Sequence, residues 1–114
     1  MSRPERLAEL IKQEVFIILT QEVSDPRIGF ITITDVKVSG DLRHASIFVS
    51  IFGDEKKQQE TVKGLESATA FVRGELGHRL ELRIVPEIIF KIDHSVARAA
   101  RIESIISDLK KERV

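Results

Sequence analysis

The sequence predicts a small α+β domain, and three observations lead to that class. Apolar residues recur at the helical period of about 3.6 in three stretches. In three other stretches they alternate with polar residues, as in half-buried strands. The order of these stretches is α-β-β-α-β-α, so a hairpin is followed by a helix that leads to the third strand. We therefore expect a three-stranded mixed sheet with the helices packed on one face.

The first helix begins at the N-terminus and ends before Pro26. Ser2 is a suitable N-cap, Glu5 completes a capping box three residues later, and Pro4 suits the first turn. Ser24-Asp25-Pro26 ends the helix, because the residue before a proline disfavours the α conformation. The apolar face of this helix comprises Leu7, Leu10, Ile11, Val15, Ile18 and Leu19.

Two strands connected by a turn follow. From Phe30 to Val38 the apolar residues change face part of the way along, which a bulge near Thr34-Asp35 would reconcile. Ser39-Gly40-Asp41 has turn-forming chemistry. From Ala45 to Ile51 apolar and polar residues alternate without a break. The two strands should therefore form a hairpin whose second strand buries one face.

The second half of the chain contains a long helix, a third strand and a last helix. The long helix starts near Glu55, and Gly77 lies near its end. Alternation resumes from Leu82 to Ile92, where Pro86 indicates an edge strand or a bulge. Ser95 can cap the last helix. The apolar stripes of the two helices comprise Val62, Leu65, Ala68, Phe71, Val72 and Leu76, and then Ala99, Ile102, Ile105, Ile106 and Leu109.

Small residues interrupt the long helix around its middle. Thr69 can bend a helix by donating its hydroxyl to a carbonyl of the preceding turn, so we expect a kink at Ala68-Thr69-Ala70 that divides the helix in two. The resulting order, α-β-β-α-kink-α-β-α, is a KH-like layout. A literal G-x-x-G stands at residues 74–77, but only residues 78–81 would remain for the helix that follows this loop in KH domains. We interpret that match as accidental.

Composition indicates one domain, residues 1–114, without linkers or repeats. The absence of cysteine excludes disulfides and thiolate metal sites, and we expect no metal and no cofactor. Neither a membrane-spanning run nor an apolar signal core is present, so we expect a cytoplasmic protein that does not bind membranes. We also expect the protein to be a monomer. Eighteen basic residues balance eighteen acidic ones. This balance disfavours non-specific coating of nucleic acid, but not a shaped interface.

Enzymatic chemistry has little support in the sequence, and we predict a non-enzyme. Asp93-His94-Ser95 contains the residue types of a hydrolytic triad, but adjacent residues cannot adopt the relay geometry. Pairing of His78 or His94 with a carboxylate would revive a small acid–base enzyme as an alternative. The segment from Ser46 to Phe52 is similar to the aromatic strand of an RRM domain. Its two phenylalanines are better interpreted as packed or half-buried.

Several motifs, in matching order and spacing over nearly the whole chain, resemble the ribosome-binding factor A family. They are residues 25–29, 36–45, 71–77 and 82–90, followed by Asp93 and Ser95. The resemblance implies a KH-like fold of type II whose G-x-x-G loop is replaced by an Ala-x-Gly kink. That kink would fall on Ala68-Thr69-Ala70, with alanine in place of glycine. Within these motifs we assign Ile84 and Phe90 to the core.

The resemblance also implies a function. Members of the family bind the free small (30S) ribosomal subunit and contact its 16S ribosomal RNA. They assist late maturation and processing of that RNA, notably in cold adaptation, and they do so without catalysis. Ribosomal proteins and assembly GTPases are further expected partners. A protein–protein interaction module that binds through its terminal helices remains the alternative.

Basic residues of the KH-like half are the predicted RNA contacts. Between Arg73 and Arg101 six Lys/Arg stand against four Asp/Glu, an excess of two, and two further arginines lie in the loops that flank the hairpin. For each arginine, an ordinary solvated ion pair is the competing interpretation. The candidate RNA-binding residues are Arg27, Arg43, Arg73, His78, Arg79, Arg83, Arg98 and Arg101.

Overall fold

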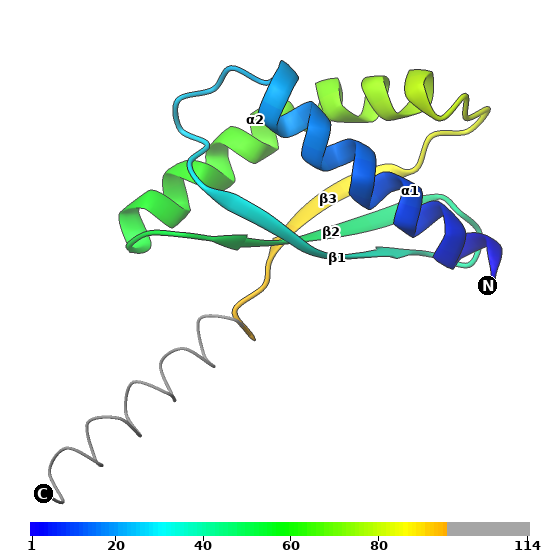
Figure 1. The fold of residues 1–114 in the computed structure, drawn as a ribbon, viewed down its shortest axis with the longest axis horizontal. Helices are drawn as coiled ribbons and strands as arrows, with labels where there is room; N and C mark the ends of the chain where they lie inside the picture. Colours follow the sequence, from blue (N-terminus) through cyan, green and yellow to red (C-terminus); the bar gives the residue numbers. More distant parts are fainter. Residues whose placement is uncertain (96–114) are drawn as a thin grey trace, which may run out of the picture.

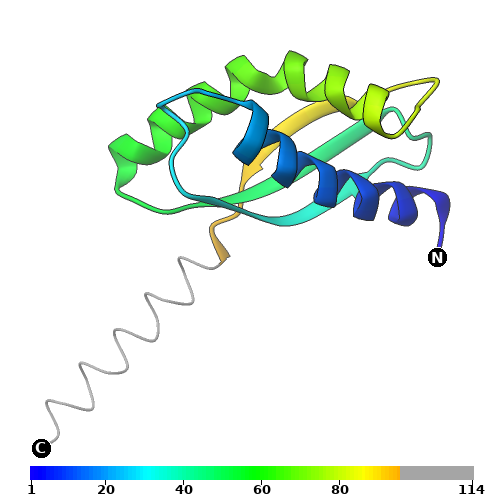
Figure 2. The same ribbon diagram turned by 45° about the horizontal axis from the view of Figure 1, so that its top comes forward.

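Two helices cover one face of a three-stranded sheet (Figures 1 and 2). The computed structural model describes residues 1–95. The last helix expected from the sequence begins at Ser95, so all of it beyond Ser95, including Arg98 and Arg101, lies outside the described residues. The described elements are α1 (Arg3–Ile17), the π-helix η1 (Ile18–Glu22), β1 (Ile31–Val38), β2 (His44–Ile51), α2 (Glu55–Arg79) and β3 (Glu87–Ile92).

The sheet is mixed, as predicted. Its strand order is β1-β2-β3; β1 and β2 are antiparallel, and β2 and β3 are parallel. Helix α2 makes the connection that a parallel pair requires, and β3 takes an edge position. Both helices and all three strands contribute to one apolar core, whose fully or almost fully buried members include Ile11, Val15, Ile18, Ile47, Val49, Leu65, Val72 and Leu76.

A bulge in β1 explains why its apolar residues change face. The register with β2 shifts between Ile33 and Asp35, so Thr34 is the extra residue. Ile33 and Val36 are consequently both buried, although they stand three residues apart in a strand. The bulge predicted near Thr34-Asp35 is confirmed, and so is the unbroken alternation of β2.

Helix α1 starts at the predicted cap and ends in a π-turn that was not predicted. The Ser2 hydroxyl accepts a hydrogen bond from the Glu5 amide at 3.2 Å. At the other end the Val23 amide donates to the Ile18 carbonyl, five residues back. The wider turn keeps Ile18 and Leu19 buried together before the chain leaves the helix.

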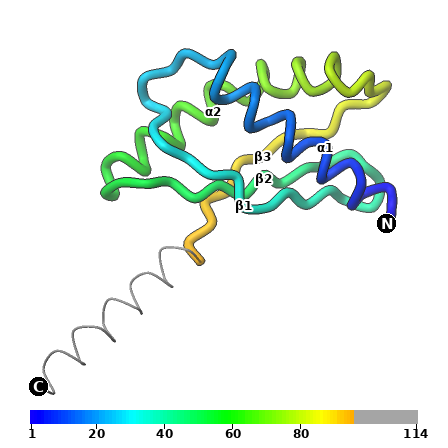
Figure 3. The backbone as a smooth tube through the Cα atoms, viewed as in Figure 1, coloured from blue at the N-terminus to red at the C-terminus, as the bar shows by residue number. Residues whose placement is uncertain are grey.

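The loop of residues 23–30 packs against α2 before it enters β1, as Figure 3 shows. The buried Thr61 hydroxyl donates to the Arg27 carbonyl at 3.2 Å, as well as to a carbonyl of its own helix. Ile28 lies directly over Gly64. A Cβ added to Gly64 would lie 2.6 Å from the Cγ1 atom of Ile28. The loop can approach α2 this closely because Gly64 has no side chain.

Helix α2 is a single helix, so the expected division into two helices is wrong. Residues 55–79 are helical throughout. The helix nevertheless changes direction around its middle (Figures 1 and 2). The Thr69 hydroxyl donates to the Leu65 carbonyl at 2.8 Å, the contact expected to bend it. Alanine at positions 68 and 70 favours helical geometry, so the turn bends without losing its helical conformation.

The end of α2 explains why β3 is shorter than predicted. The Leu82 amide bonds to the Gly77 carbonyl and the Glu81 amide to the His78 carbonyl, with Glu81 at φ 52°, a Schellman ending. Residues 80–86 therefore form a connection, and the strand expected from Leu82 begins at Glu87. Ile84 lies in this connection with 65% of its surface exposed, so its assignment to the core is wrong. Phe90, by contrast, packs against the core as predicted.

Candidate nucleic-acid interface

Arg79 is held by three carboxylates from three elements. It forms ion pairs with Glu14 of α1 at 3.1 Å, with Glu22 of η1, and with Glu75 one turn earlier in α2 at 3.5 Å. Hydrogen bonding to Glu14 is the largest influence that raises the pKa of Arg79 above its ordinary value. This guanidinium joins α1, η1 and α2, so its charge is already compensated within the molecule.

Arg73 fastens the connection that precedes β3. Its Nε donates to the Pro86 carbonyl at 3.1 Å and its Nη2 to the Val85 carbonyl at 2.9 Å. Glu87 lies 3.5 Å from the same guanidinium. Most of the donor capacity of Arg73 is therefore used to position the chain entering β3.

Arg27 is paired with Asp25 in the loop between η1 and β1. Its Nη2 lies 2.6 Å from the Asp25 carboxylate and also donates to the Ser67 hydroxyl on α2 at 3.1 Å. Hydrogen bonds from the Arg27 side chain and amide hold the pKa of Asp25 at about 2. Arg27 thus anchors the loop on α2 at the residues where the helix bends.

The remaining described candidates, Arg43, His78 and Arg83, are exposed. Within residues 1–95 none of these three side chains takes part in a salt bridge or side-chain hydrogen bond. They come from the β1–β2 turn, the last turn of α2 and the connection to β3. These segments lie at the same end of the molecule (Figures 1 and 2), and the Glu87 amide donates to the Arg43 carbonyl at 2.8 Å. We call Arg43, His78 and Arg83 the basic end.

The start of α1 lies at this end as well (Figure 1), and it adds two exposed arginines that sequence reasoning missed, Arg3 and Arg6. Arg3 and Arg6 belong to no sequence motif, so the sequence alone gave no reason to select them. Only the tertiary arrangement brings the first turn of α1 beside the β1–β2 turn.

Two lysines flank Phe48 on β2: Lys91, which belongs to the basic excess counted in the sequence but was not a candidate contact, and Lys37, which sequence reasoning missed. Lys37 Nζ lies 5.5 Å and Lys91 Nζ 5.8 Å from the centre of the Phe48 ring. Phe48 is half-buried, as expected, but Phe52 is 80% exposed, so its interpretation as a packed ring is wrong. The similarity of this segment to an aromatic RNA-binding strand was the available signal.

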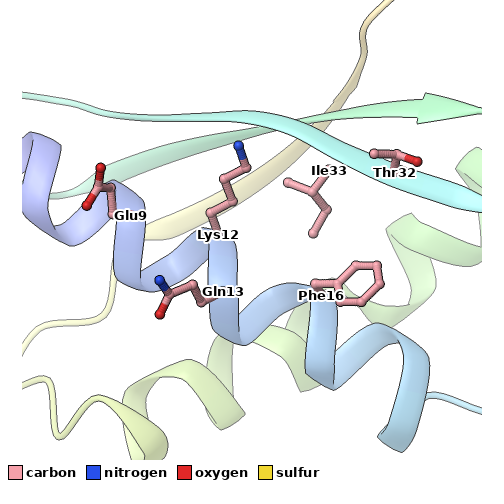
Figure 4. A pocket seen from close by; sticks show the side chains of 6 residues that line it. All are labelled: Glu9, Lys12, Gln13, Phe16, Thr32 and Ile33. Carbon is pink, nitrogen blue, oxygen red and sulfur yellow. The ribbon is translucent and has the colours of Figure 1, made fainter.

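The described part of the chain assembles no acid–base pair of the kind an enzyme would use. No histidine hydrogen bonds to a carboxylate within residues 1–95, and no three of their His, Asp or Glu side chains form a metal-binding group. A cleft of about 480 Å³ lies between α1 and β1 (Figure 4). Its charged lining residues are Glu9 and Lys12, with no nucleophile and base in contact. The literal G-x-x-G of residues 74–77 lies inside α2 and forms no loop. No helix within residues 1–95 is both long and apolar enough to cross a membrane.

Fold and surface together define a KH-like α+β domain whose candidate functional groups are exposed cations. The family model for ribosome-binding factor A matches residues 3–106. The ribosome-binding factor A of Halothermothrix orenii is 50% identical over 110 residues, which cover 96% of this chain and 90% of that protein. The chain therefore belongs to the ribosome-binding factor A family.

Two structural matches have the same fold. The solution structure of a Thermotoga maritima protein is 34% identical, with a TM-score of 0.70, over 78% of this chain and 85% of that one. A second match is a homology model of the Thermus thermophilus ribosome-binding factor A, fitted into a cryo-EM map of a 30S complex. It is 23% identical, with a TM-score of 0.59, and the match covers 81% of this chain and 92% of that one.

Proposed function

We propose that this protein binds the free 30S subunit and its 16S ribosomal RNA and assists late maturation and processing of that RNA, including in cold adaptation. It does so without catalysis, as a cytoplasmic monomer whose residues 1–114 form one domain. Family membership supports the 30S subunit as partner, since a Thermus thermophilus relative has been fitted into a map of a 30S complex. Ribosomal proteins and assembly GTPases are further proposed partners.

The observation that carries the proposal is the basic end. Arg43 and Arg83 are exposed and form no salt bridge within residues 1–95, whereas the guanidinium groups of Arg27, Arg73 and Arg79 pair with carboxylates of the same molecule. Free guanidinium groups are suited to phosphate contacts that position a protein on folded RNA. Arg98 and Arg101, outside the described residues, remain proposed contacts.

Assistance without bond chemistry requires different affinities for different states of the subunit. A protein that binds an immature arrangement of RNA more tightly than the mature one shifts the population and then dissociates. The exposed cations supply affinity, and the shape of the domain supplies the discrimination.

Co-sedimentation of the full chain with purified free 30S subunits, intact ribosomes and immature particles tests the proposal. We expect binding to free and immature small subunits and little binding to intact ribosomes. Equal binding to all three, or to none, would contradict it.

A further inference from the structure

Two phenylalanines at one end of the sheet are almost fully exposed. Phe30 precedes β1 and Phe52 follows β2, and 84% and 80% of their surfaces are exposed. The Phe52 amide donates to the Phe30 carbonyl at 3.1 Å, one step beyond the last pair of the β1–β2 ladder, Ile31 and Ile51. Because strand residues alternate and Ile51 is buried, both rings lie on the outer face, the face that neither α1 nor α2 covers (Figure 2).

The apolar surface continues from Phe30 around the free edge of β1. Phe30 lines a hollow of about 370 Å³ together with Phe16 of α1, which is 48% exposed. Further apolar residues that line this hollow are Leu19, Val23, Ile28 and Ile31. We call the surface formed by Phe52, Phe30 and this hollow the apolar end. Exposed apolar surface of this kind is typical of a contact site.

The chain leaves the sheet beside the apolar end. The Asp93 amide donates to the Val49 carbonyl at 2.7 Å, three residues before Phe52, or about 10 Å along a strand. The Asp93 carboxylate accepts hydrogen bonds from the Ser95 amide at 2.9 Å and, across β2, from the Thr34 hydroxyl of β1 at 2.7 Å. These bonds hold Ser95 on the outer face. In Figures 1 and 2 the described chain accordingly ends on the side of the sheet opposite α1 and α2.

The segment that follows has the length and the pattern to cover the apolar end. The sequence predicts a helix whose apolar stripe comprises Ala99, Ile102, Ile105, Ile106 and Leu109. As a helix, residues 96–109 would be about 21 Å long. They would thus extend from β3 across the roughly 10 Å to β1 and on to the hollow at its edge. An amphipathic helix gains most of its stability by packing such a stripe against another apolar surface.

Charge on the outer face selects neither an anionic nor a cationic ligand. Lys37 and Lys91 are matched by two carboxylates of the same face, Asp35 and Asp93. Residues 96–109 are balanced too, with two arginines and two acidic residues. Apolar contact is therefore the main attraction that this end of the sheet offers. A segment tethered at Asp93 is present at a far higher effective concentration than any separate partner.

We propose that residues 96–109 fold back from Asp93 and pack their apolar stripe on the apolar end, over Phe52 and Phe30 and into the hollow beside Phe16. The apolar end is then occupied within the molecule and is not a contact for the ribosome. It lies at the opposite end of the strands from the basic end, which stays accessible. This inference concerns a contact within the chain and does not depend on the proposed function.

Nuclear Overhauser effects (NOEs) in the full chain test the packing directly. With labelled methyl groups, we expect NOEs between the rings of Phe30 and Phe52 and the methyl groups of Ile102, Ile105, Ile106 and Leu109. We expect none for Phe71, which is 46% exposed on α2. Absence of the expected NOEs would overturn the proposal. So would NOEs between labelled and unlabelled chains in a mixed sample, because the segment would then cover a second copy.

Hydrogen exchange in variants gives an independent test. Phe30→Ala/Phe52→Ala removes only exposed rings, so the fold of residues 1–95 should persist. Amides of residues 99–109 should exchange roughly tenfold faster or more in this variant, because the segment loses the surface on which it packs. Ile89→Ala is the matched control, 53% exposed and about 13 Å before Asp93 along β3, and should exchange at the wild-type rate. Equal exchange in wild type and both variants would contradict the packing.

Co-sedimentation of the same variants with free 30S subunits keeps this proposal separate from the proposed function. If the NOEs are absent and Phe30→Ala/Phe52→Ala binds the subunit more weakly than wild type, the apolar end contacts the subunit and the proposal is wrong. If the NOEs are present and wild type does not bind the subunit, the packing is supported and only the proposed function fails.

Discussion

The arginines of this protein divide into two groups with different physical roles. Arg27, Arg73 and Arg79 connect segments that are distant in sequence, through carboxylates and carbonyl oxygens. Arg43 and Arg83 have no such partner within residues 1–95. Substitutions in the first group should act on stability, and substitutions in the second on binding.

Arg79→Gln and Arg83→Gln form a matched pair that tests this division. Arg79→Gln leaves Glu14, Glu22 and Glu75 without their shared cation, so it should lower the Tm measurably. Arg83→Gln, at an exposed position, should change the unfolding free energy by less than about 0.5 kcal/mol. It should instead weaken binding to the 30S subunit. Thermal unfolding measures the stability of both variants, and co-sedimentation measures their binding to the 30S subunit. A lower Tm for Arg83→Gln together with weaker 30S binding for Arg79→Gln would refute the division.

Asp25→Asn tests the loop anchor through pH. The pKa of Asp25 is lowered from 3.8 to about 2 by Arg27. Because the folded-state pKa is depressed, the pair contributes its full stability above about pH 4 and loses it as the pH falls toward 2. Denaturant unfolding should show wild type more stable than Asp25→Asn at pH 6, with the difference shrinking between pH 4 and 2. A constant difference over that range would show that the Asp25 charge is not involved.

At the scale of helices and strands, the sequence pattern correctly predicted those features that depend only on interactions between neighbouring residues. The Ser2 cap, the bulge at Thr34 and the alternation of β2 could be derived because each depends on neighbouring residues. The start of β3 could not. Leu82 and Ile84 alternate like a strand, yet the Schellman ending and the Arg73 contacts hold this segment in a connection.

The candidate site shows the same limit. Basic residues could be found from the sequence, but which of them stay free depends on pairs such as Arg79 with Glu14, 65 residues apart.

Two glycines of α2 give opposite predictions for the same substitution. Gly64→Ala would place a Cβ 2.6 Å from Ile28 Cγ1, whereas Gly74→Ala meets nothing within 4 Å. Overpacking costs about 1–3 kcal/mol and alanine gains about 1 kcal/mol in helix propensity, so Gly64→Ala should be destabilising. Gly74→Ala should stabilise by about 1 kcal/mol. Urea unfolding measures both, and stabilisation by Gly64→Ala would show that loop 23–30 does not pack on α2 as described.

At the scale of the whole molecule, zero net charge and RNA binding are compatible because the internal salt bridges involve more carboxylates than arginines. Within residues 1–95 five carboxylates form salt bridges with only three arginines, and these carboxylates are Glu14, Glu22, Asp25, Glu75 and Glu87. The arginines of the basic end form no salt bridge within residues 1–95. A neutral protein of this kind should bind random RNA weakly and require a shaped ribosomal surface.

The salt dependence of binding to purified free 30S subunits tests the central claim most directly. If about four phosphates are neutralised, the affinity of wild type should fall roughly a hundredfold between 50 and 200 mM salt. Arg43→Gln/Arg83→Gln should bind more weakly, with a log–log slope shallower by about 0.9 for each contact removed. Binding that is insensitive to salt, or a double variant with the wild-type slope, would contradict the claim that these cations contact ribosomal RNA.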